Sequence, residues 1–146
     1  MLERPLALLG PTELQPALNR FKNQLNENSA RFARIGVIPE MNHNESVAWG
    51  GVGGDKDPAS DQQVLLFLTW KGMHKRVSHR IDWMIAHTTT DFAWKMQGEG
   101  DTLLESLLHL CIVMDWLSIA LALLHGKDPA AIGPISALKD FLNAKN

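Results

Sequence analysis

The sequence predicts an α/β fold built on a parallel sheet, and three observations lead to this class. Short apolar runs typical of strands alternate with segments in which apolar residues recur at helical spacing. Val64 to Trp70 is a continuous apolar run, as in a central strand that is buried on both faces. A polar cluster from Glu40 to Glu45 follows another strand-like run, and ligands of open sheets bind at the carboxyl ends of strands. At 146 residues, we expect one domain over residues 1–146 with a single core.

The individual elements are predicted from apolar patterns and boundary residues. Strands are expected where short apolar runs stop at Gly or Pro, and Pro39 ends the second strand because it lacks a backbone N–H. Helices are expected where apolar residues recur three or four positions apart, with Thr12 as the N-cap of the first. The predicted strands are residues 6–9, 32–38, 64–70 and 92–96; the predicted helices are residues 12–28, a short one through Val47 and Trp49, 75–87, 103–124, and a tail helix that starts at Asp128-Pro129.

The segment from Leu103 to Leu124 is predicted to be a long helix. Asp101 or Thr102 can cap it, and Glu105, three residues after Thr102, would complete a capping box. Its residues are apolar almost all round, which is typical of a helix covered on most sides. In a chain of this size the helix either packs centrally or exposes a face that another subunit covers. The second case predicts a homodimer.

Composition and charge exclude several classes of partner. The net charge of -2 gives no electrostatic reason to expect nucleic acid or an anionic membrane. No apolar stretch reaches the ~20 residues of a membrane span, and the N-terminal apolar run is too short for a signal peptide. Cys111 is the only cysteine and lies in an apolar run, which predicts a buried thiol in a reducing compartment, the cytoplasm. The histidines are not spaced to meet with an acid, so no metal site is expected.

Three sequence blocks resemble a known family. They are P-E-M-N-H-N-E at residues 39–45, R-F-K-N-Q-L-N-E-N at 20–28, and L-A-L-L-H-G-K-D-P-A-A-I-G-P-I-S-A-L-K at 121–139. Together they resemble the bifunctional phosphoglucose/phosphomannose isomerase family, and more narrowly its C-terminal sugar isomerase (SIS) domain. The resemblance implies a three-layer SIS fold with a parallel four- to five-stranded sheet flanked by helices. It also implies aldose–ketose isomerisation of hexose 6-phosphates, with no metal or organic cofactor.

The resemblance assigns catalytic roles to three residues. Glu27 matches the family's base, and His43, sixteen positions later, matches the histidine that opens the sugar ring from the neighbouring subunit. A carboxylate at the end of a helix is mildly unfavourable, which is in line with a role other than helix stability. Lys139 matches the lysine that the family places at the active site from its last helix, with Lys145 as the competitor for that position.

The remaining polar residues of the cluster are expected to bind or orient the substrate. They are Glu40, Asn42, Asn44 and Glu45. For the two acids a structural role is the stronger alternative, because either could orient His43 or simply lie at the positive end of a helix.

A phosphate-binding loop is missing from the sequence. Such loops offer Ser and Thr hydroxyls at a helix N-terminus, whereas the one hydroxyl run, Thr88 to Thr90, is expected at a helix C-terminus, where the dipole disfavours anions. In the family that loop belongs to a first SIS domain. The chain therefore resembles half an active site, with an N-terminal SIS domain in the same or another chain as a possible partner. Whether it is an enzyme stays open; the alternative is a non-catalytic phosphosugar-binding or scaffolding module.

Overall fold

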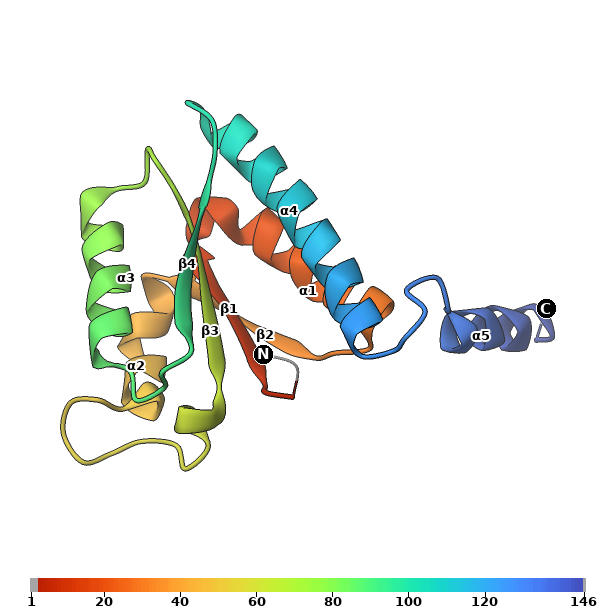
Figure 1. Ribbon diagram of the computed structural model, residues 1–146, viewed down its shortest axis with the longest axis horizontal. Helices are drawn as coiled ribbons and strands as arrows, with labels where there is room; N and C mark the ends of the chain where they lie inside the picture. Colours follow the sequence, from red (N-terminus) through yellow and green to blue (C-terminus); the bar gives the residue numbers. More distant parts are fainter. Residues whose placement is uncertain (1–2, 146) are drawn as a thin grey trace.

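A parallel sheet lies at the centre of the computed structural model, which describes residues 3–145. The sheet has four strands in the order β2-β1-β3-β4 (Figure 1). All neighbouring strands pair in parallel, so their carboxyl ends meet at one edge of the sheet. The strands are β1 (Leu6–Pro11), β2 (Ala33–Ile38), β3 (Val64–Trp70) and β4 (Ala93–Gly98).

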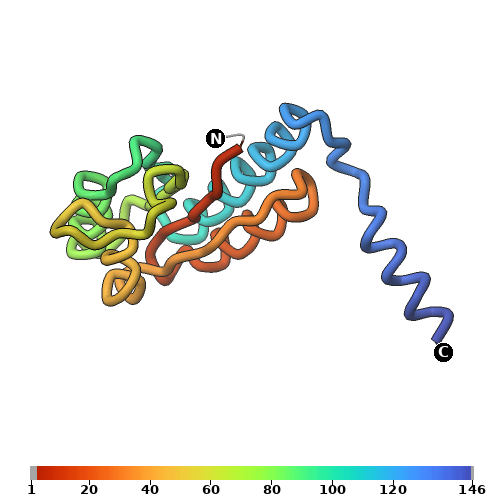
Figure 2. The backbone as a smooth tube through the Cα atoms, turned by 90° about the horizontal axis from the view of Figure 1, so that it is seen from below, coloured from red at the N-terminus to blue at the C-terminus, as the bar shows by residue number. Residues whose placement is uncertain are grey.

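Helices cover both faces of this sheet, which gives the predicted three-layer α/β arrangement. One pair, α1 and α4, packs on one face, and α2 and α3 lie on the other (Figure 1). The last helix, α5, extends away from the rest of the molecule (Figure 2). The helices are α1 (Gln15–Ser29), α2 (Glu45–Trp49), α3 (Lys75–His87), α4 (Leu103–Leu124) and α5 (Gly133–Asn143), with short 3-10 turns η1 (Thr12–Leu14), η2 (Glu40–His43) and η3 (Ser60–Gln62).

The two central strands divide the core into two clusters. Leu6 and Leu8 of β1 pack with the side chains of α1 and α4, whereas Ala7 and Leu9 pack with those of α3 and η2. This alternation is what a strand buried on both faces requires. The strand predicted at residues 64–70 is confirmed, and its residues Val64 to Thr69 are buried.

Two predicted helix starts are wrong. Thr12 does not cap α1; it begins η1, and its hydroxyl donates to the Ile38 carbonyl, 3.4 Å away. Asp128 does not start the tail helix either, because it instead closes a turn by accepting from the Ala130 N–H at 2.9 Å, and α5 begins only at Gly133. The Thr12 hydroxyl is used by a contact with β2 and the Asp128 carboxylate by a local turn, and the sequence pattern reveals neither.

The long helix α4 has the predicted bounds and capping box, with one face buried and one exposed. Residues Ser106, Leu110, Met114 and Ser118 recur every fourth position and are buried. The opposite face leaves large apolar side chains exposed: Leu104, Leu108, Ile112, Trp116, Leu123 and Leu124. The sequence left two positions open for this helix, a central one or one with an exposed apolar face. Within a single chain the helix has the exposed face, so the central position is wrong.

Helix α4 also corrects the expectation about membrane spans. By length and composition alone, its 22 residues are long and apolar enough to cross a membrane. One side nevertheless packs on α1, where Arg20 and Asp115 form an ion pair at 2.6 Å. Core helices of soluble proteins can also be this long and this apolar, so the length and composition of α4 do not by themselves indicate a membrane span.

The loop after α2 is fastened to the end of α3. Gly51 has a φ of +89°, and a Cβ atom there would lie 1.1 Å from the His87 carbonyl oxygen, so only glycine fits this approach. Thr89, just after α3, donates its hydroxyl hydrogen to the Trp49 carbonyl at 3.3 Å. These contacts hold α2, which follows the polar cluster, against the same layer as α3.

Candidate functional site

The polar cluster lies at the carboxyl edge of the sheet, directly after the edge strand β2. Met41 is buried and anchors η2 in the core, while Glu40, His43 and Asn44 are exposed around it. The cluster thus forms a fixed turn that presents an imidazole and a carboxylate to solvent. Such a turn is suited to reach a ligand or a second molecule.

Two residues of the cluster make structural contacts. The side chain of Asn44 accepts a hydrogen bond from the Glu45 N–H at 2.7 Å, as an N-cap of α2 does. The carboxylate of Glu45 forms an ion pair with Arg34 of β2, whose guanidinium also lies 5.1 Å from the centre of the Trp49 ring. For Glu45 this geometry favours the structural alternative over an orienting role toward His43.

Asn42 points its amide toward α3. Its Nδ2 lies 2.9 Å from the Met84 sulfur and 3.4 Å from the Ser46 hydroxyl, whereas its Oδ1 is buried and has no hydrogen-bond partner among residues 3–145. The residue lines a cleft of about 320 Å³ together with His79, Arg80 and Trp83 of α3. No sequence pattern indicates this cleft, because its walls come from segments almost forty residues apart.

Glu27 lies in the last turn of α1, exposed and far from the polar cluster. Since β1 and β2 are parallel, α1 returns the chain from the carboxyl edge of the sheet to the amino edge. A 15-residue helix is about 22 Å long. Glu27 and His43 are therefore at opposite ends of one molecule, on the order of 20 Å apart, and cannot contact the same sugar within a single copy.

Lys139 lies on α5, where every residue is exposed. The linker to α5 begins beside Glu27, because Lys127 donates to the carbonyl oxygens of Glu27 and Asn28 at 3.1 and 2.9 Å. From there α5 leaves the body of the molecule (Figure 2). Within one copy, Lys139 is brought neither to Glu27 nor to His43, and the competing Lys145 lies over the Phe141 ring at 5.4 Å.

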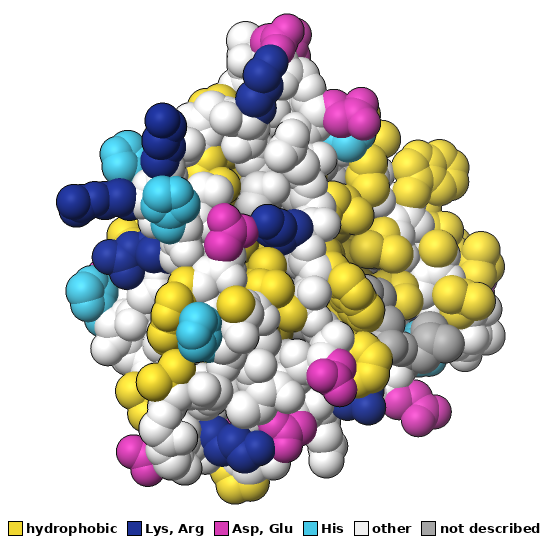
Figure 3. Space-filling view, turned by 60° about the vertical axis from the view of Figure 1, so that its left-hand side comes forward, with side chains coloured by type: hydrophobic (Ala, Val, Ile, Leu, Met, Phe, Trp, Pro, Cys, Tyr) yellow, Lys and Arg dark blue, Asp and Glu magenta, His cyan; other side chains and the backbone are white. Residues whose placement is uncertain are grey.

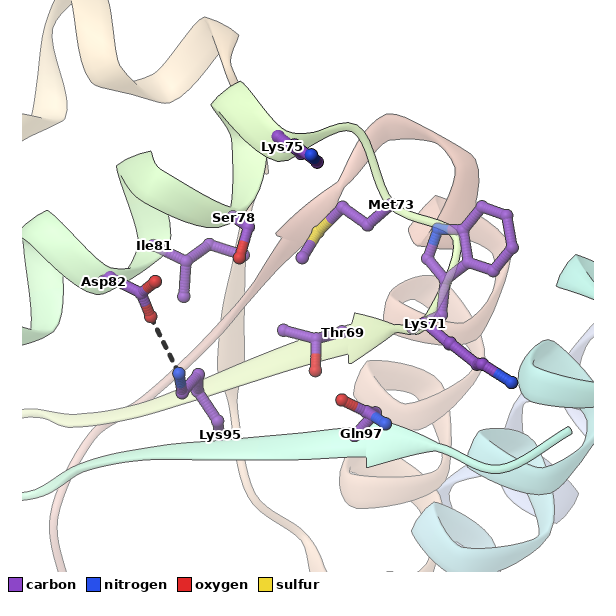
Figure 4. A pocket seen from close by; sticks show the side chains of 10 residues that line it. Thr69, Lys71, Met73, Lys75, Ser78, Ile81, Asp82, Lys95 and Gln97 are labelled. Atoms are coloured by element: carbon purple, nitrogen blue, oxygen red, sulfur yellow. Dashed lines mark hydrogen bonds and ion pairs between the residues drawn. The ribbon is translucent and has the colours of Figure 1, made fainter. Parts of the chain in front are cut away.

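A second cleft opens at the carboxyl ends of β3 and β4. It has a volume of about 400 Å³, and Figure 4 shows Thr69 and Gln97 on the strands facing Ser78 of α3. Lys95 and Asp82 form an ion pair of 2.7 Å across it. The turn that leads from β3 to α3, residues 71–74, carries no hydroxyl side chain, and the hydroxyl groups of this cleft are those of Thr69 and Ser78.

Two further observations concern reactive groups and metals. Burial raises the pKa of the Cys111 thiol, in line with its expected position in an apolar run, although the side chain is only partly buried. Among residues 3–145, no group of three His, Cys, Asp or Glu side chains could hold a metal ion.

The arrangement of the sheet defines the class of protein. A glucose-6-phosphate isomerase like protein from Thermus thermophilus superposes with a TM-score of 0.68 at 15% sequence identity, covering 90% of this chain and 43% of that chain. A glucosamine-6-phosphate deaminase from Thermotoga maritima gives a TM-score of 0.61 at 12% identity, over 88% of this chain and 38% of that one. The fold is thus the SIS-type α/β fold of phosphosugar isomerases and deaminases.

Sequence comparison narrows the class to one family. Residues 1–142 match the model of the bacterial phospho-glucose isomerase C-terminal SIS domain, and the chain belongs to this family. A bifunctional phosphoglucose/phosphomannose isomerase from Aquifex aeolicus is 33% identical over 126 residues, which are 84% of this chain and 38% of that protein. The enzyme of the same name from Thermoplasma acidophilum is 25% identical over 135 residues, 90% of this chain and 40% of that protein. The resemblance found in the sequence is confirmed, and the chain spans about two fifths of the length of these relatives.

Proposed function

We propose that this chain supplies the C-terminal half of an isomerase that converts glucose 6-phosphate or mannose 6-phosphate to fructose 6-phosphate. The observation that carries the proposal is the family match over residues 1–142, which includes the blocks around Glu27 and His43. Two curated relatives bear the name of this activity. Both residues are exposed in the structure, as groups that receive a substrate must be.

The proposed chemistry moves one proton between two carbons. Glu27 would take the proton from C2 of the open-chain aldose and return it to C1, through an enediol, as a general base and then a general acid. His43 would open the ring by giving a proton to the ring oxygen, while the bond between C1 and that oxygen breaks and the C1 hydroxyl loses its proton to solvent to become the carbonyl. Lys139 would place its ammonium group near the oxygen on which negative charge develops.

The assembly would have to bring these residues together, because one copy keeps Glu27 and His43 at opposite ends of the sheet. We propose a homodimer in which His43 of one copy reaches the Glu27 of the other. The exposed apolar face of α4 supports this, since an obligate interface resembles a core cut in half. An N-terminal SIS domain, in the same or another chain, would supply the hydroxyl loop for the phosphate. A cytoplasmic location fits the metabolic enzymes whose names the relatives bear.

The second candidate function is a non-catalytic phosphosugar-binding or scaffolding SIS module. The turn after β3 favours the scaffolding form of this candidate, because the side chains of residues 71–74 offer no hydroxyl to a phosphate. Turnover distinguishes the two candidates. Conversion of glucose 6-phosphate to fructose 6-phosphate is measured with the chain alone and then mixed with the N-terminal part of the Aquifex aeolicus relative. Turnover in either case supports the isomerase, and none in both supports the module.

The assignment of the base is tested in whichever assembly turns over. Glu27→Gln keeps the size of the side chain and should lower kcat by ~10² to 10⁴. Glu40→Gln is the matched control, since Glu40 is also exposed but lies beside His43. If Glu27→Gln leaves turnover within about twofold while Glu40→Gln abolishes it, the base is the acid of the polar cluster. His43→Ala should slow the cyclic substrate much more than an open-chain analogue.

A further inference from the structure

The turn of α1 that carries Glu27 is held from the side of α4. Glu27 itself is exposed, and its carboxylate makes no hydrogen bond or ion pair with residues 3–145. The next residue, Asn28, is half-buried, and its Nδ2 donates to the Ser118 hydroxyl of α4 at 2.7 Å and to the Oε1 of Gln24 at 2.9 Å. The fold thus fixes the backbone beside Glu27 and leaves the carboxylate free.

Ser118 gives Asn28 an oriented acceptor. Its side chain is fully buried, and its hydroxyl donates to the Asp115 carbonyl at 2.7 Å. Because a hydroxyl group has one hydrogen, this bond leaves the lone pairs of its oxygen to accept from the Asn28 amide. Such a hydrogen bond is directional, whereas the apolar contacts between the two helices are not. The bond between Asn28 and Ser118 therefore determines where the last turn of α1 lies along α4.

Two further features show that the end of α1 is set by its surroundings. Lys127 donates to the Asn28 carbonyl at 2.9 Å. Ala30, the C-cap of α1, has a φ of +52°, in the left-handed region where glycine is the usual residue. A residue with a side chain keeps such a conformation where its neighbours hold it there. Tertiary contacts, more than local preference, therefore place the turn that carries Glu27.

The helix that holds this turn is also the one through which two copies are proposed to associate. α4 buries Ser118 on one side and exposes a row of large apolar side chains, among them Trp116, on another. Figure 3 shows hydrophobic side chains gathered on the side of the molecule where α4 lies. In the proposed dimer, His43 of one copy has to meet Glu27 of the other. How well they meet depends on where α1 lies on α4.

We propose that Asn28 is a positioning residue for the base of the proposed isomerase. Through Ser118 it keeps Glu27 in register with α4, and so with the second copy that docks on α4. The inference rests on the proposed function. A general base must lie within hydrogen-bond reach of the carbons between which it moves the proton, and a misplacement of about 1 Å can lower the rate on the order of 10²-fold.

Kinetics of the assembly that turns over tests this role. Asn28→Leu and Ser118→Ala should each lower kcat at least about tenfold and change KM by less than about threefold, because a misplaced base slows proton transfer without weakening the binding of the sugar. Asn26→Ala is the matched control, since Asn26 lies on the other side of Glu27, is exposed and forms no hydrogen bond with residues 3–145. Its kcat should stay within about twofold. An unchanged kcat in Asn28→Leu, or an equal decrease in Asn26→Ala, would overturn the proposal.

The double variant separates positioning from stability. Asn28→Leu combined with Ser118→Ala replaces both polar partners by apolar groups, which can be nearly neutral for stability. Its Tm should therefore lie closer to that of the unmodified chain than the Tm of either single variant. Its kcat should stay as low as in the single variants, because an apolar contact does not restore a directional bond. Recovery of kcat together with Tm would mean that Asn28 only stabilises the fold and would contradict the inference.

Hydrogen exchange of the chain of 146 residues distinguishes a failure of this inference from a failure of the proposed function. In Asn28→Leu, the amide hydrogens in the last turn of α1 should exchange at least about tenfold faster, while those of β3 keep their rate. Unchanged exchange in that turn would overturn the role of Asn28, whether or not an assembly turns over. Absence of turnover from the unmodified assembly would refute the isomerase, and the exchange rates would still decide whether Asn28 holds this turn.

Discussion

Lys127 joins the end of α1 to the linker that leads to α5. Its Nζ lies 3.1 Å from the Glu27 carbonyl oxygen, 2.9 Å from that of Asn28 and 3.1 Å from that of Asp128. The last carbonyl groups of a helix have no partner within the helix, and an ammonium group has three N–H donors. Lys127 therefore satisfies the end of the helix that carries Glu27. The substitution Lys127→Met removes these hydrogen bonds and keeps most of the side-chain volume.

The expected loss of stability follows from two contributions. A cation at the negative end of a helix contributes about 0.3–1 kcal/mol. Hydrogen bonds from a charged donor contribute about 1.5–3 kcal/mol when they are well buried. Because Lys127 is only partly buried, we take the lower part of the range and expect Lys127→Met to reduce the free energy of unfolding by about 1–2 kcal/mol. For a chain of this length that corresponds to a decrease in Tm of roughly 3–7 °C.

Urea unfolding followed by circular dichroism measures this loss. The midpoint should fall while the dependence on urea concentration stays the same. Lys22→Met is the control, since Lys22 lies on the same helix and forms no hydrogen bond or ion pair with residues 3–145. Its effect should stay below about 0.5 kcal/mol. A loss below about 0.3 kcal/mol for Lys127→Met, or an equal loss for Lys22→Met, would refute the role assigned to Lys127.

Two further predictions concern the acid dependence of stability and self-association. Hydrogen bonds from the backbone N–H and hydroxyl of Thr102 and the N–H of Asp101 lower the pKa of Glu105 from 4.5. Because the pKa of Glu105 is lower in the folded chain than in the unfolded chain, its carboxylate stabilises the fold above the unfolded pKa, and this stabilisation is lost as the pH falls through the folded pKa. Glu105→Gln should therefore flatten the fall of Tm between about pH 5 and pH 3. An unchanged slope of Tm against pH would contradict this. On α4, Trp116 is 68% exposed. Trp116→Glu should convert a dimer to a monomer, as measured by sedimentation at a protein concentration of roughly tens of micromolar. Val52→Glu is the control, because Val52 is 61% exposed but lies in a loop, and this variant should stay dimeric. A monomeric unmodified chain at that concentration would count heavily against the dimer.

The elements with strong local patterns were predictable within a residue or two. The continuous apolar run of β3 and the helical spacing of α3 give the bounds that the structure has. Thr102 and Glu105 form the predicted capping box of α4. These signals depend only on adjacent residues or on residues three or four positions apart, so the sequence contains them in full. The starts of α1 and α5 could not be predicted in this way, because Thr12 bonds to Ile38 of β2 and Asp128 closes a turn ahead of α5.

The sequence blocks predict which residues form the candidate site, but they do not predict how those residues are arranged. The blocks around Glu27 and His43 identified the family, and the family match confirms it. That Glu27 and His43 lie at opposite edges depends on the direction of α1 between two parallel strands, which is a property of the sheet. The partner of Glu45, Arg34, lies eleven residues earlier on β2, so the ion pair could not be read from spacing on a helix.

The sequence by itself determined the class of fold, the bounds of its strongest elements and the family, because each depends on local patterns or on blocks of residue identities. Only the tertiary structure decided which face of α4 is buried. A helix that is apolar almost all round has no preferred side of its own, and the side that packs is the one whose side chains fit against α1 and the sheet. The tertiary structure likewise brought Asn42 beside Arg80 and Trp83, since the packing of α3 on the sheet joins segments that are far apart along the chain.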